Sequence, residues 1–147
     1  MESTRPQLRT GFFDYQFRDP VSGWTHFAGA LLGVAALVFL VEKSLSTGTI
    51  WHVVSFAIFG ISMVLLYSSS AFYHLMNVSD ETRLVLRRVD HTMIFLLIAG
   101  TYTPFCLVSL RGPLGWGIFG LVWALAILGM FMKIFWIHSP RDRKSVV

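Results

Sequence analysis

Residues 50–76 of this 147-residue chain read IWHVVSFAIFGISMVLLYSSSAFYHLM, with no Asp, Glu, Lys or Arg among them. An α-helix rises about 1.5 Å per residue, so roughly 20 apolar residues cross the hydrocarbon core of a bilayer. The run is long enough to cross, but its last turns carry serines, a tyrosine and a histidine. It therefore predicts a membrane helix that ends in a polar site.

Three further apolar runs of similar length lie at about 21–41, 91–110 and 114–137. Hydrophobic residues make up 54% of the chain and charged residues only 14%, a balance that a water-soluble domain of this size could not hide in one core. We predict an all-α integral membrane bundle of four transmembrane helices over residues 21–138, with the lipid bilayer as its partner. The short connections make consecutive helices antiparallel neighbours.

The basic residues indicate the orientation of the chain. They gather before the first span, between spans two and three, and after span four, whereas the other two loops hold only Lys43 and Arg111. By the positive-inside rule, residues 1–20, the middle loop and the C-terminal tail are cytoplasmic. This spacing also argues against a nucleic-acid partner, since the net charge of +4 is not concentrated in one basic stripe.

The predicted topology brings distant polar residues to one membrane depth. Span one starts near His26, span two ends with Ser70 and His74, and span three starts at Asp90 and His91. Ser70 and His74 are four residues apart, so they share a helix face and the hydroxyl can lie beside the imidazole. Ionisable groups inside a membrane are costly unless they have partners, so this cluster is a candidate functional site.

Each member of this cluster also has a simpler explanation. A histidine near a helix end is often an interfacial or packed side chain, and Asp90 is a suitable residue to cap span three. Ser79 could cap a short interfacial helix in the middle loop. Ser70 could return a hydrogen bond to the preceding helical turn.

Four ordered motifs resemble one known family. The chain is similar to the hemolysin III group of bacterial membrane proteins, related to the adiponectin and progestin receptors and, more distantly, to alkaline ceramidases. The motifs that carry the resemblance are Trp24-Thr25-His26, Tyr67-Ser68-Ser69-Ser70-Ala71-Phe72-Tyr73-His74, Leu86-Arg87-Arg88-Val89-Asp90-His91 and Ala99-Gly100-Thr101-Tyr102-Thr103-Pro104-Phe105.

The resemblance implies a seven-helix parent in the bacterial inner membrane, with a zinc site near the cytoplasmic face. His74 matches one of three histidine ligands, Asp90 matches the residue that orients the reacting water, and Ser70 matches a hydroxyl beside them. Three protein ligands leave a fourth zinc position for water, whose pKa falls towards about 7. The resemblance thus favours a zinc-dependent membrane hydrolase acting on a lipid amide or a related bond.

Two departures from the family pattern stand out. The usual Glu-x-x-Asn before span one is replaced by Asp19-Pro20-Val21-Ser22, and the His-x-x-x-His that supplies the other two ligands does not occur. His26 and His91 could replace them only with the metal in a different place. We therefore expect an N-terminal fragment, inactive by itself and with an incomplete zinc site.

The C-terminal tail, residues 139–147, supports this expectation. Its last six residues, DRKSVV, are also what the nucleotides GATCGGAAGAGCGTCGTG encode, a stretch of a widely used sequencing adapter. We expect the tail to be non-native from residue 142.

Two other functions stay open at this stage. One is a non-enzymatic membrane sensor or receptor-like protein, in which a metal would join helix ends and a lipid ligand would shift the packing. The other is a pore-forming cytolysin, although none of the four spans carries the polar stripe that would line an aqueous pore.

Overall fold

The computed structural model describes residues 17–135, and every regular element in that range is helical. The helices are α2 (Pro20–Thr47), α3 (Ile50–Leu75), α4 (Asp80–Pro104), which continues as the π-helical segment η1 (Phe105–Leu110), and α5 (Pro113–Phe135). Within residues 17–135, four helical segments, with α4 and η1 counted as one, are long and apolar enough to cross a membrane. The predicted all-α membrane fold is confirmed, whereas the tail at 139–147 and most of segment 1–20 lie outside the described residues.

Local chemistry explains where two of the helices begin. Asp19 precedes α2 and accepts a hydrogen bond from the Ser22 N–H, while Pro20 occupies the first turn, where its missing N–H costs nothing. Ser79 caps α4 in the same way, by accepting from the Thr82 N–H. The cap predicted at Ser79 is therefore confirmed, but it starts one continuous helix rather than a short separate one.

The expectation that Asp90 caps span three is wrong. Asp90 lies in the eleventh position of α4, inside the helix, because the cap at Ser79 and the acidic first turn start the helix at Asp80. Hydropathy locates where the chain enters lipid, whereas the helix begins earlier, in the polar region.

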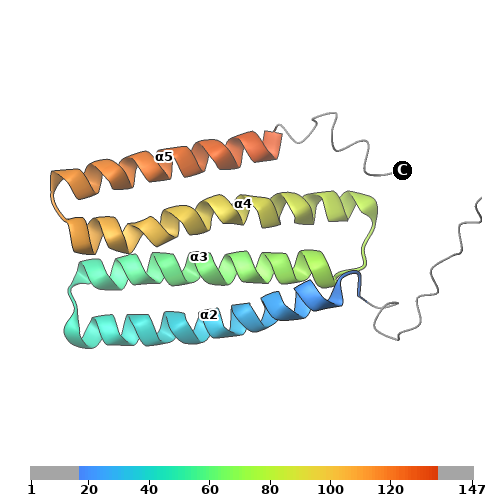
Figure 1. The fold of residues 1–147 in the computed structure, drawn as a ribbon, viewed down its shortest axis with the longest axis horizontal. Coiled ribbons are helices and arrows are strands. Elements are labelled where there is room, and N and C mark those ends of the chain that lie inside the picture. Colours follow the sequence, from blue (N-terminus) through green and yellow to red (C-terminus); the bar gives the residue numbers. More distant parts are fainter. Residues whose placement is uncertain (1–16, 136–147) are drawn as a thin grey trace, which may run out of the picture.

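The four helices lie side by side in chain order, each antiparallel to the next (Figure 1). Small residues let them approach closely, as is common between membrane helices. Gly29 lies against Tyr67 where α2 meets α3, Gly100 against Ser62 where α3 meets α4, and Gly129 against Phe95 where α4 meets α5; these six residues mark the three seams. Large apolar side chains remain exposed along the row, which suits contact with lipid.

The row has two polar ends. The start of α2 and the α3–α4 connection lie at one end, and the α2–α3 and η1–α5 connections lie at the other (Figure 1). The second end contains a tight turn at Arg111 and Gly112, whose φ angles of 32° and 82° both fall in the left-handed region.

Candidate functional site

The start of α2 and the end of α3 are joined by a carboxylate–imidazole pair. The Asp19 Oδ2 lies 3.2 Å from the His74 Nδ1, and the Asp19 backbone N–H donates to the His74 carbonyl oxygen at 3.1 Å. His74 is 25% exposed and Asp19 46% exposed, so water reaches the pair. Hydrogen bonds from Ser22 are the largest influence on the carboxyl and lower the pKa of Asp19, and His74 lowers it further.

A second polar pair lies one turn deeper between the same helices. The His26 Nδ1 and the Ser70 Oγ are 2.7 Å apart, and Ser70 is buried. The His26 ring also makes edge contacts with the rings of His74, at 5.5 Å between centroids, and Tyr67, at 6.0 Å. We call Asp19, His26, Ser70 and His74 the polar cluster.

The structure therefore brings together His26, Ser70 and His74, as the topology predicts. One detail differs, because the Ser70 hydroxyl pairs with His26 across the seam and not with His74 on its own helix. The α2–α3 packing brings the His26 ring to the hydroxyl.

Asp90 and His91 make no hydrogen bond or ion pair with the polar cluster within the described residues. The Asp90 Oδ2 lies 3.9 Å from the His91 Nδ1, and the same nitrogen is 2.7 Å from the Arg87 carbonyl oxygen. Both residues face local partners on α4. The described residues thus show no direct contact that would support a shared role of Asp90 and His91 with the polar cluster.

Asp19 is the member of the polar cluster that sequence reasoning did not select. In the sequence it stands out only as a departure from a family motif. The signal was present in the topology, since the first residue before span one and the last turn of span two must meet at one end of an antiparallel helix pair.

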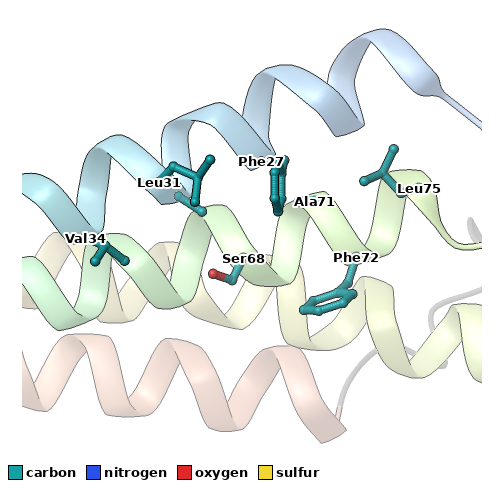
Figure 2. A pocket seen from close by; sticks show the side chains of 8 residues that line it. Phe27, Leu31, Val34, Ser68, Ala71, Phe72 and Leu75 are labelled. Carbon is teal, nitrogen blue, oxygen red and sulfur yellow. The ribbon is translucent and has the colours of Figure 1, made fainter.

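An apolar groove of about 300 Å³ runs along the same α2–α3 seam. Figure 2 shows Phe27 and Leu31 of α2 facing Ala71 and Leu75 of α3, with the Ser68 hydroxyl as a polar atom at the groove wall. Three lining residues directly follow members of the polar cluster in sequence: Phe27, Ala71 and Leu75. An apolar groove thus lies beside the polar cluster.

The described residues do not form a complete metal site by themselves. Within residues 17–135, no group of three or more His, Cys, Asp or Glu side chains is placed to hold an ion. The His74 Nδ1 lies 3.2 Å from the Asp19 Oδ2, and a carboxylate beside one ring nitrogen is common behind metal-binding histidines.

Comparison with known proteins identifies the family. Residues 15–146 match the sequence profile of the family described as Haemolysin-III related. The chain is a member of the haemolysin III family. No solved structure matches the chain.

Two curated relatives of this haemolysin III protein show how far the similarity extends. This chain is 47% identical over 113 residues to the "Hemolysin-3 homolog" of Bacillus subtilis (strain 168). The matched region covers 77% of this chain and 53% of the relative. This chain is also 45% identical over 114 residues to the "Hemolysin-3" of Bacillus cereus. That match covers 78% of this chain and 52% of the relative. The chain thus spans about half the length of the curated relatives it matches.

Proposed function

We propose that this haemolysin III protein contributes one half of a zinc-dependent membrane hydrolase site that acts on a lipid amide or a related bond. The observation that carries the proposal is the contact of the Asp19 carboxylate with the His74 Nδ1. It orients the imidazole and occupies one ring nitrogen, so that Nε2 is the atom left to bind a metal. The remaining ligands would come from chain outside the described residues.

Zinc at this position would supply a Lewis acid and lower the pKa of a nearby water towards about 7. The Asp19 carboxylate, 3.2 Å from the His74 Nδ1, would favour the tautomer that carries its proton on Nδ1, since a carboxylate accepts hydrogen bonds. Ser70 and His26 hold each other across the seam and could exchange a proton with a substrate that reaches them. Asp90 keeps its predicted role of orienting water only if the full site brings it towards His74.

The apolar groove beside the polar cluster supports a lipid substrate. Its lining is almost wholly hydrocarbon, with the Ser68 hydroxyl as a polar group. An acyl chain lying in this groove would bring its polar end to the depth of Ser70 and His74.

The test begins with zinc bound per chain, measured by plasma mass spectrometry on the protein expressed from the complete reading frame at its locus. We expect His74→Ala to lose zinc, and Asp19→Asn to bind it about 10- to 100-fold more weakly, as other second ligand-shell changes do. His91→Ala is the matched control, since His91 pairs locally on α4. Equal zinc content in the wild type and in His74→Ala would contradict the proposal.

Turnover distinguishes the enzyme from the sensor. The zinc-loaded protein is assayed with N-acyl sphingosine and other acyl amides in mixed micelles. Cleavage that disappears in His74→Ala supports the hydrolase. Zinc binding that depends on His74 without cleavage of any acyl amide would favour the sensor or receptor-like function instead.

A second candidate is a pore-forming cytolysin, favoured by the printed names of the two relatives, "Hemolysin-3 homolog" and "Hemolysin-3". The helices present mainly large apolar side chains to their surroundings, so pore formation would need several chains to gather polar residues around one axis. Release of a trapped dye from liposomes at low protein-to-lipid ratio would establish it.

A further inference from the structure

The polar end opposite the polar cluster contains a second pocket, of about 230 Å³. Its walls are Trp51 from the first turn of α3, Trp116 from the first turn of α5, and the Arg111–Gly112 turn between η1 and α5. The buried residues Cys106 and Leu107 line it from η1. Water occupies about 30 Å³ per molecule in the liquid, so the pocket has room for a small polar group.

Arg111 gives the pocket a positive charge. Its Nη2 donates to the Thr49 Oγ1 at 3.2 Å, which ties the guanidinium to the start of α3. No Asp or Glu side chain in residues 17–135 forms an ion pair with Arg111. A guanidinium carries five N–H donors, so most of them remain to bind another acceptor.

The backbone at Arg111 is also unusual. Its φ of 32° makes it the one non-glycine residue with positive φ in the described chain. Such a conformation costs energy for a residue with a Cβ atom, and strained residues of this kind gather at ligand sites. A glycine would fit this turn more easily, which makes the Arg111 side chain a candidate for a functional role.

The two tryptophans place the pocket at the membrane surface. Trp51 and Trp116 meet edge to face, with 5.7 Å between ring centroids, and are 41% and 51% exposed. Tryptophan is enriched at the level of the lipid headgroups, where its ring is buried and its N–H reaches polar atoms. Arg111 thus lies where phosphate groups are abundant.

We propose that this pocket binds a phosphate-bearing anion, either a phospholipid headgroup or a free phosphate. The planar guanidinium matches two phosphate oxygens with parallel N–H donors, which makes arginine the preferred partner for such groups. The Thr49 contact holds the guanidinium at the pocket, and the rings of Trp51 and Trp116 form part of the pocket wall. This site is separate from the polar cluster and does not depend on the proposed hydrolase activity.

The test uses the full chain in dodecyl maltoside, a detergent without phosphate. Dihexanoyl phosphatidylglycerol, below its micelle concentration, and inorganic phosphate are titrated separately by isothermal calorimetry. We expect saturable binding of at least one probe, weakened about tenfold or more in Arg111→Gln, since a hydrogen bond to a charged group is lost. Lys43→Gln is the matched control, because Lys43 is the other basic residue of the predicted loops at this end and does not line the pocket.

Arg111→Gly separates binding from folding. Glycine accepts a φ of 32° without strain, so the helix content measured by circular dichroism should be kept while binding is lost. Binding of the phospholipid alone would identify a headgroup site, and binding of both probes would identify a phosphate site. Failure of the wild type to bind either probe, or equal binding by wild type and Arg111→Gly, would overturn the proposal.

Discussion

Asp19 uses its two carboxylate oxygens in different contacts, since Oδ1 accepts from the Ser22 N–H and Oδ2 faces His74. Asp19→Asn keeps a capping side chain, because asparagine is about as good an N-cap as aspartate, but it removes the charge. The side chain is 46% exposed, so solvent screens the pair. We expect the free energy of unfolding at pH 7 to fall by less than about 1 kcal/mol.

The pH dependence of this effect follows from the sign of the shift. Hydrogen bonds from Ser22, and then His74, hold the pKa of Asp19 below its ordinary value of 3.8. A lowered folded-state pKa gives stability that is present above the unfolded value and lost as the pH falls through the folded value. The Tm difference between wild type and Asp19→Asn in maltoside micelles should therefore shrink as the pH falls below 3.8 and through the lowered folded-state pKa of Asp19. A Tm difference that does not shrink as the pH falls below 3.8 would contradict this.

The residues of the polar cluster show what the sequence can predict at this scale. His26, Ser70 and His74 could be grouped because antiparallel spans put residues from distant positions at one depth. The Ser70–His26 pairing could not, since it depends on how α2 is rotated against α3. Asp90 matched a motif, but its side chain points to its neighbour His91, a direction that spacing alone does not give.

At the scale of the helices, the α3–α4 seam depends on Gly100. A methyl group there would collide with the Ser62 Oγ and lie 2.9 Å from its Cβ. Overpacking of this kind costs about 1–3 kcal/mol, so Gly100→Ala should lower the free energy of unfolding by about that much. The measurement is unfolding in mixed micelles, followed by circular dichroism.

Two companion variants make this packing test specific. Gly117→Ala has no neighbour within 4 Å of the added methyl group and should not destabilise the protein. The double variant Ser62→Gly with Gly100→Ala removes the side chain that the added methyl group would contact. It should therefore recover part of the lost free energy of unfolding. A Gly100→Ala protein as stable as the wild type would show that the seam is looser than the structure has it.

The helices also show where hydropathy stops being informative. It locates all four membrane segments, because lipid demands long apolar runs. It places the third at 91, eleven residues after α4 begins, since the charged turns that precede the lipid are helical too. Pro104 removes one backbone N–H donor from this helix, and the chain continues directly after it as the π-helical turns of η1.

At the scale of the whole molecule, the four helices form a row in which each packs mainly on its chain neighbours (Figure 1). Short connections predict this neighbour order. They do not predict an open row, since the side chains that meet lipid and those that meet another helix are equally apolar in sequence. Both sides of the row are available to lipid or to further helices.

The orientation of this row in the membrane is the remaining whole-molecule prediction. Basic residues gather at the end that holds the α3–α4 connection, including Arg83 in the first turn of α4, and the positive-inside rule puts that end in the cytoplasm. The end with the Arg111–Gly112 turn should then face outward. Single cysteines at Ser79 and Gly112, in a Cys106→Ala background, report on the two ends.

In cells with a permeabilised outer membrane, a membrane-impermeant maleimide should label Gly112→Cys at once and Ser79→Cys only after the inner membrane is opened. Gly112 is exposed and has no neighbour within 4 Å of an added Cβ, so space does not limit its labelling. Its φ of 82° disfavours any side chain, so Gly112→Ser is used to check that a substituted protein still folds. Lys43→Cys, at the same end as Gly112, should behave like Gly112→Cys. The reverse labelling pattern would place the polar cluster outside the cell and the Arg111 pocket against the anionic cytoplasmic leaflet.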